Sequence, residues 1–124
     1  MLTHITQLID LFAGHCSDPS TLLELRQMVG DERTWCKAHD LFDRIREKTL
    51  KAEQRKNDRA GCQYLFEEVC AQTLYNLSDI SPPFSEHSPA PFDEDSPYWI
   101  VPNALSLARR LGIHESEVTR IVAA

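Results

Sequence analysis

Apolar residues recur every three or four positions along most of the chain, which is the spacing that lines one face of an α-helix. This spacing predicts a first helix over 3–13, ended by Gly14 in a left-handed conformation. A second helix is predicted from Asp18-Pro19 to Gly30, because aspartate is a good cap and proline fits the first helical turn. The chain is therefore expected to open with two short helices.

The longest helix is predicted over 32–56, where apolar positions alternate in steps of three and four. This seam suits a helical hairpin or a helix at a dimer interface, and it consists of Trp35, Ala38, Phe42, Ile45, Thr49 and Ala52. Asn57-Asp58 interrupts the pattern, and a fourth helix is predicted over 59–77. Because the connection is short, these two helices are expected to lie antiparallel.

The segment 78–97 is too rich in proline for a helix, because proline lacks the N–H of the helical hydrogen bond. It is expected to be extended. Two aromatic residues, Phe84 and Phe92, are predicted to hold it across the helical body. The alternative is a mobile loop.

Two further short helices are predicted near the C-terminus. Pro102 stands where the first of them begins, Gly112 ends it, and the second starts at His114 or Glu115. The 124 residues have room for one core, so we predict a single all-α domain of about six helices. Its parts are a four-helix part over 1–77, a Pro-rich acidic segment over 78–101 between helices four and five, and a C-terminal helix pair over 102–124.

The chain carries no apolar run of the length that a membrane helix needs, so no membrane partner is expected. The N-terminus lacks a basic region, and Asp10 interrupts its apolar residues, so a signal peptide is not predicted. A cytoplasmic location is therefore expected. The cysteines are then expected to be reduced and mostly buried, and they are Cys16, Cys36, Cys62 and Cys70.

Charge is unevenly distributed along the sequence. The net charge of −6 disfavours non-specific binding to nucleic acid, which needs a basic surface. Over 44–59, however, seven basic residues stand against three acidic ones, whereas 79–97 holds five acidic residues and no Lys or Arg. The two regions are either solvated surfaces or surfaces that attract each other, within one chain or between two copies.

The C-terminal stretch Leu105–Ala124 resembles the helix-turn-helix of bacterial repressors. The resemblance rests on a small residue, a turn glycine and two spaced aliphatic residues, which are Ala108, Gly112, Val118 and Ile121. It implies that four residues would face the major groove of DNA, namely His114, Ser116, Thr119 and Arg120. Glu115 and Glu117 would repel phosphate, so a purely structural helix pair is the favoured interpretation.

Candidate catalytic or metal-binding patterns are sparse. His39-Asp40 resembles the metal-binding pair of HD-type phosphohydrolases, for which His15 and Asp43 are the candidate further ligands. Cys36 and His39 have metal-ligand spacing, but the two remaining helical cysteines are too far apart to complete a zinc site. There is no Gly-x-Ser-x-Gly motif and no glycine-rich phosphate loop. We therefore predict no catalytic residue, no cofactor and no metal ion, and we interpret Glu67-Glu68 as a solvated face.

The sequence thus favours a protein–protein interaction or homo-oligomerisation module over an enzyme. Its predicted interaction surface combines interface-favoured aromatic residues with the basic cluster, and it consists of Tyr98, Trp99, Arg44, Lys48, Lys51 and Arg55. The alternative is a DNA-binding regulator that uses the C-terminal helix pair. A metal-dependent hydrolase around His39-Asp40 is the third hypothesis.

Overall fold

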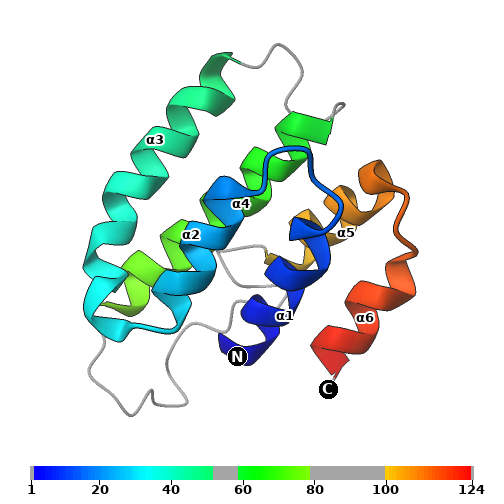
Figure 1. The fold of residues 1–124 in the computed structure, drawn as a ribbon, viewed down its shortest axis with the longest axis horizontal. Helices are drawn as coiled ribbons and strands as arrows, with labels where there is room; N and C mark the ends of the chain where they lie inside the picture. Colours follow the sequence, from blue (N-terminus) through cyan, green and yellow to red (C-terminus); the bar gives the residue numbers. More distant parts are fainter. Residues whose placement is uncertain (1, 52–58, 79–99, 124) are drawn as a thin grey trace.

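The computed structural model describes residues 2–51, 59–78 and 100–123, and these residues are helical with no strand among them (Figure 1). This confirms the predicted all-α class. The elements are α1 (Leu2–Ala13), α2 (Ser20–Val29), the 3₁₀ helix η1 (Glu32–Lys37), α3 (Ala38–Lys51), α4 (Arg59–Leu77), α5 (Ile100–Leu111) and α6 (Glu115–Ala123). Nearly all of the predicted Pro-rich segment, with Phe84 and Phe92, lies outside the described residues.

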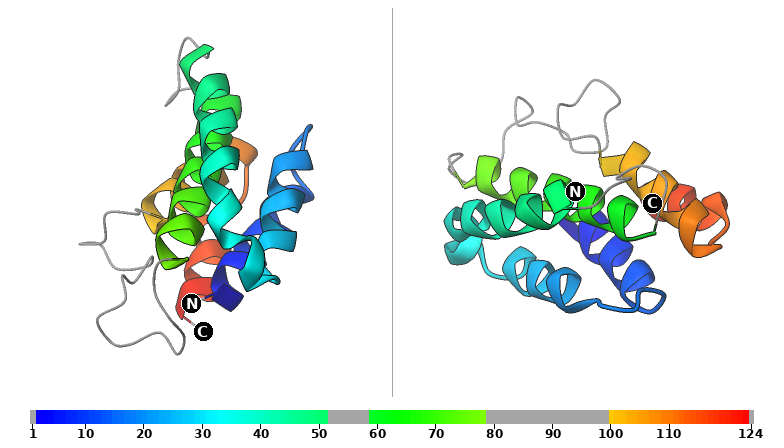
Figure 2. Two further views of the ribbon diagram at one scale, coloured as in Figure 1. Left: turned by 90° about the vertical axis from the view of Figure 1, so that its left-hand side faces the viewer. Right: turned by 90° about the horizontal axis from the view of Figure 1, so that it is seen from above.

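Helix α4 occupies the centre of the fold. It packs against α2, α3, α5 and η1, and α3 runs antiparallel beside it as predicted (Figure 1). Figure 2 shows α3 and α4 side by side, with α1 and α2 packed on one side of the pair. Because α4 is covered on several sides, it buries residues around much of its circumference, including Cys62, Phe66, Cys70, Ala71 and Leu74.

The helix predicted over 32–56 is divided, and that prediction was wrong in one respect. Its first turns form η1, and the α-helix begins only at Ala38. The Asp31 side chain accepts a hydrogen bond from the backbone N–H of Arg33 (3.2 Å), and the buried Trp35 ring donates from Nε1 to the carbonyl of Met28 (2.8 Å). The indole bond ties η1 back to the end of α2, and the Asp31 bond holds the first turn of η1. Such contacts favour the tighter 3₁₀ geometry at a helix start.

The apolar seam of the third helix packs inside the molecule. Trp35, Ala38 and Ile45 are buried, and Phe42 is half-buried against the core. Leu41, which the seam did not include, is buried as well. The buried face of α3 is therefore wider than a coiled-coil seam, and it serves the contact with α4. The seam side chains Thr49 and Ala52 lie outside the described set.

Two glycines end helices in different ways. The prediction of a left-handed Gly14 was wrong, because α1 closes with a tight turn from the His15 N–H to the Phe12 carbonyl (2.9 Å). Gly112 is the one glycine with positive φ (75°) among the described residues. There the Ile113 N–H bonds to the Ala108 carbonyl (2.8 Å), as in a Schellman motif.

The core is continuous and draws on every α-helix. The rings of Phe12 and Phe66 meet edge to face, with centroids 5.0 Å apart and planes 81° apart. Val118 on α6 is fully buried, so the C-terminal helix packs back onto the body, where it contacts α1 and α5. Within the described ranges, no helix is both long enough and apolar enough to span a bilayer. The four cysteines are free thiols, although Cys36 is exposed rather than buried.

Replacing Phe66 with alanine should lower the free energy of unfolding by about 3–5 kcal/mol, because it removes a fully buried ring and leaves a cavity beside Phe12. Urea unfolding followed by circular dichroism measures the loss. Tyr75→Ala, on the same helix but 36% exposed, is the matched control and should cost only about 1 kcal/mol. Equal losses would contradict a core centred on α4.

Gly112→Ala and Gly14→Ala form a second matched pair, since a Cβ at either position meets nothing within 4 Å. Alanine at 112 must adopt φ near 75°, so a loss of about 1–2 kcal/mol in unfolding free energy is expected. Alanine at 14 should be neutral or stabilising by about 0.5 kcal/mol, because it reduces the entropy of the unfolded chain. Thermal unfolding of both variants tests the difference.

Candidate functional site

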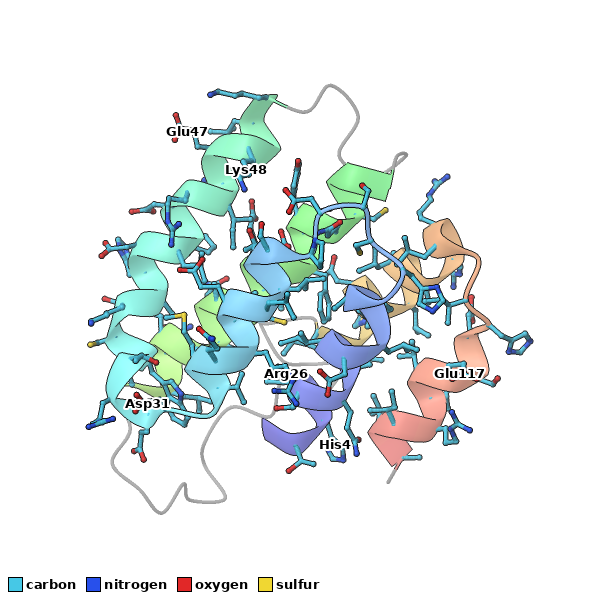
Figure 3. All side chains as sticks on the ribbon, in the orientation of Figure 1. His4, Arg26, Asp31, Glu47, Lys48 and Glu117 are labelled. Atoms are coloured by element: carbon cyan, nitrogen blue, oxygen red, sulfur yellow. The ribbon has the colours of Figure 1, made fainter. Side chains whose placement is uncertain are left out.

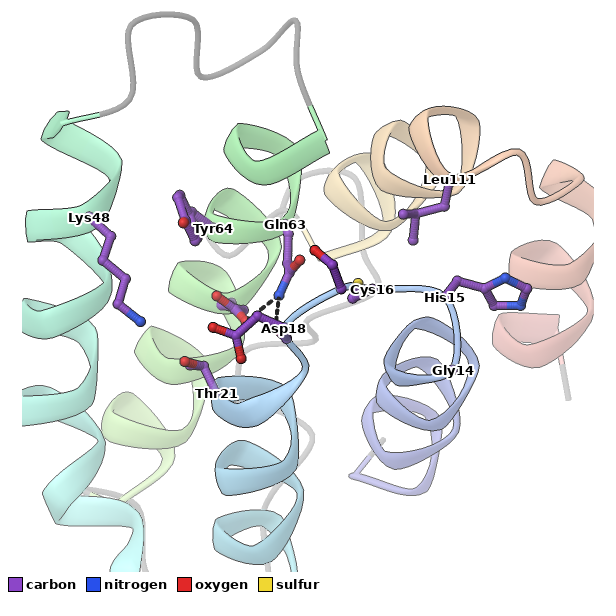
Figure 4. A pocket seen from close by; sticks show the side chains of 11 residues that line it. Gly14, His15, Cys16, Asp18, Thr21, Lys48, Gln63, Tyr64 and Leu111 are labelled. Atoms are coloured by element: carbon purple, nitrogen blue, oxygen red, sulfur yellow. Dashed lines mark hydrogen bonds between the residues drawn. The ribbon is translucent and has the colours of Figure 1, made fainter.

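A pocket of about 430 Å³ lies where the α1–α2 loop meets α3 and α4 (Figure 4). We call it the Glu67 pocket, after the buried carboxyl in its wall. Its volume falls within the usual range for small-molecule sites. The residues that line it are Gly14, His15, Cys16, Ser17, Asp18, Thr21, Lys48, Gln63, Tyr64, Glu67 and Leu111.

Glu67 is the most unusual residue of the pocket. It is only 1% exposed, so the prediction that Glu67-Glu68 forms a solvated face was wrong for this residue. Burial raises the pKa of its carboxyl to about 7, and the Gln63 hydrogen bond and the Lys48 charge partly oppose that rise. Glu67 therefore exchanges a proton near neutral pH.

Gln63 connects this carboxyl to the loop. Its side-chain Nε2 donates to Glu67 Oε2 (3.1 Å) and to the backbone carbonyl of Asp18 (3.0 Å) (Figure 4). The Asp18 carboxylate accepts from the N–H (3.2 Å) and hydroxyl (2.7 Å) of Ser20, which keeps the pKa of Asp18 below its ordinary value. Helix α2 begins at Ser20 with Pro19 as its N-cap, so the prediction of Asp18 as the cap was wrong by one residue. The Asp18 carboxylate instead holds the turn that leads into α2, and it lines the pocket.

Lys48 is the cation of the site. Its side chain extends from α3 towards Asp18 and Gln63 (Figure 4), and its charge lowers the pKa of both Asp18 and Glu67. Burial, followed by the Glu67 charge, raises the pKa of the half-buried Cys16 thiol to about 11. The same two causes raise the pKa of the fully buried Cys70 thiol. Both thiols are therefore protonated at neutral pH, which disfavours thiolate chemistry here.

The predicted interaction surface is placed only in part. Arg44 donates to Glu24 on α2 (2.9 Å), Lys51 lies 3.8 Å from Glu47, and Lys48 reaches the pocket. The remaining predicted residues lie outside the described part of the chain, and they are Arg55, Tyr98 and Trp99.

The four residues of the helix-turn-helix resemblance lie at the contact between α5 and α6. Ala108 and Val118 are fully buried, Ile121 is half-buried, and Gly112 makes the turn. A structural pair of packed helices accounts for all four, so DNA recognition stays a prediction.

The four proposed DNA-contact residues are exposed on or beside α6. His114 Nδ1 accepts from the Ser116 N–H (3.1 Å), Thr119 bonds to its own helix, and Arg120 pairs with Glu117 (2.9 Å). Glu117 lies on α6 (Figure 3), so the only basic residue of this helix already has an acidic partner. This pairing weakens the attraction of the helix for phosphate.

The residues of the hydrolase hypothesis are dispersed. His39 Nδ1 lies 3.5 Å from Asp43 on the exposed side of α3, and its ring is 5.0 Å from that of Tyr75. His15 lines the Glu67 pocket instead. Over 2–51, 59–78 and 100–123, no three His, Cys, Asp or Glu residues are arranged to hold a metal ion.

Comparison of the chain with protein-family models, curated proteins and solved structures finds no match. The functional argument therefore rests on the chemistry of the described residues.

Glu67→Gln should change how stability depends on pH. The carboxyl ionises near its ordinary value of 4.5 in the unfolded chain and near about 7 in the folded chain, so the folded state holds the extra proton between those values. The stability that this proton supplies is complete below about pH 4.5 and is lost as pH rises through about 7. We therefore compare the unfolding free energy of Glu67→Gln with that of the parent chain at two pH values. The variant minus the parent should be roughly 3 kcal/mol larger at about pH 8 than near pH 4.

Urea unfolding at the two pH values measures this gain. Glu47→Gln is the matched control, because it removes a carboxylate that is 71% exposed, and it should change stability by well under about 1 kcal/mol at either pH. A Glu67→Gln variant with the pH profile of the parent chain would contradict the raised pKa.

Proposed function

We propose that the chain is a homo-oligomerisation module that associates through the exposed side of α3. The observation that carries the proposal is a strip of three residues spaced four apart along α3, in which Phe42 is half-buried and Arg46 and Leu50 are exposed. Leu50 is 67% exposed, which is the largest exposure among the large apolar residues of the described chain. The Arg46 guanidinium lies 6.0 Å from the centre of the Phe42 ring.

The position of α3 supports this proposal. Its main contacts are with α4 and η1, so among the described helices it lies at the edge of the fold (Figure 1). Arginine, aromatic and aliphatic side chains in one strip are the composition that protein interfaces favour. A partner laid along this strip would cover an apolar residue that is now in water.

Charge complementarity supports a second copy as the partner. Over 44–51, α3 carries Arg44, Arg46, Lys48 and Lys51 against Glu47. The sequence over 79–97 holds five acidic residues and no Lys or Arg. Each copy thus carries both a basic and an acidic stretch of sequence, and the attraction between them would weaken as salt screens the charges.

Sedimentation of the full chain over a range of concentrations tests the proposal. The average mass should rise with concentration, and high salt should reduce that rise. Leu50→Asp should weaken association by at least about tenfold, because a carboxylate would replace the apolar contact at the proposed interface.

Leu23→Asp on α2 is the matched control, since Leu23 is 49% exposed but lies on another helix, and it should associate like the parent chain. Replacing Asp93, Glu94 and Asp95 by their amides should weaken association as high salt does. A chain that stays monomeric at the highest concentration would refute self-association.

A further inference from the structure

We propose that the Glu67 pocket binds a small molecule that carries a protonated amine, with the Glu67 carboxylate as its counter-ion. This inference is independent of the proposed association through α3, because it rests on the pocket wall and not on the strip Phe42, Arg46 and Leu50. It assigns a ligand-binding activity to the α1–α2 loop and α4.

Ionising Glu67 inside the protein costs free energy. The residue is 1% exposed, so its carboxylate has lost most of its hydration. Gln63 supplies one hydrogen bond to Oε2, and the Lys48 charge helps from α3. Burial nevertheless outweighs both, because the carboxyl holds its proton to about pH 7. A cation placed against this carboxylate would offset that cost.

The groups around Glu67 come from several elements. The loop brings the Asp18 carboxylate and the protonated thiol of Cys16, whereas the His15 imidazole extends away from Asp18 and Gln63 (Figure 4). Helix α2 brings the Thr21 hydroxyl, and α4 brings the Tyr64 hydroxyl.

Two further titratable groups of the described chain lie near Glu67. Helix α3 brings Lys48, and on α4 the Cys70 thiol also feels the Glu67 charge. Among the described lining residues, two carboxyl groups therefore accompany one lysine, so this part of the pocket has one negative charge more than it has positive charges once Glu67 ionises.

The groups of the pocket wall suit an amine better than an anion. Among the described residues, Lys48 is the one Lys or Arg that lines the pocket, and it belongs to an exposed stretch of α3. Both N–H bonds of the Gln63 amide are already directed at Asp18 and Glu67, and an ionised carboxylate only accepts, so this part of the wall offers acceptors to a guest. An ammonium group donates three hydrogen bonds and accepts none, and so it matches this wall.

The test uses three probes with one carbon skeleton: ethanolamine, ethylene glycol and glycolate. Each is titrated into the full chain, and the chemical shifts of backbone amides report binding. Ethanolamine should bind, with shifts centred on the α1–α2 loop and on α4 near Glu67. Its affinity should rise roughly tenfold from about pH 6 to pH 8, because an ionised Glu67 is needed and its pKa is about 7.

Two variants serve as further tests. Glu67→Gln should weaken ethanolamine binding and remove its pH dependence, whereas Glu47→Gln should leave both unchanged. Lys48→Met should strengthen ethanolamine binding several-fold, because it removes a competing cation while keeping the aliphatic stem. This second variant keeps the proposal testable if Glu67→Gln fails to fold.

Four outcomes would overturn the proposal. The first two are binding of glycolate in preference to ethanolamine and an affinity for ethanolamine that does not change with pH. The other two are weaker ethanolamine binding by Lys48→Met and the lack of a saturable shift at ethanolamine concentrations on the order of 100 mM. None of them bears on sedimentation, so failure here and failure of the α3 association can be told apart.

Discussion

The enclosure of α4 is the constraint on which the rest of the structure depends. A helix that is covered by α2, α3, α5 and η1 has little solvent to hydrate its polar side chains. Its polar residues must then find partners within the protein, and Thr73 does so by donating to the Val69 carbonyl (2.7 Å). Glu67 meets the same constraint with a hydrogen bond from Gln63 and a raised pKa. The unusual chemistry of the pocket thus follows from the position of α4.

Helix positions could be predicted from the sequence because local signals agree with the packing. The bounds of α4 match the predicted 59–77, and Gly112 follows the last residue of α5, where the sequence predicts the end of that helix. The predictions fail where tertiary bonds decide the backbone. The periodicity carries no signal for the indole bond from Trp35 to Met28 that accompanies η1. It carries none for the tight turn after Phe12 either.

The candidate site was harder to predict than the fold. Periodicity assigns one buried face to each helix, so Glu67 was placed on the opposite, solvated face. A signal was nevertheless present, because three of its neighbours on the helix are small or apolar and buried, as Phe66, Cys70 and Ala71 show. Lys48 was singled out for its charge alone. Its neighbours in the pocket come from a loop about 30 residues earlier and a helix about 15 residues later, and single-sequence spacing does not bring them together.

The two hydrogen bonds of Gln63 fix more than the geometry of the loop. A backbone carbonyl only accepts, so the side of the amide that faces Asp18 must be its NH₂ group. The same NH₂ group then donates to Oε2 of Glu67, and that oxygen cannot also carry a proton directed at the amide. A carbonyl oxygen accepts a hydrogen bond better than a hydroxyl oxygen, so the amide favours the neutral form of Glu67 whose hydrogen is on Oε1. The amide thereby biases which oxygen of the buried acid gives up the proton.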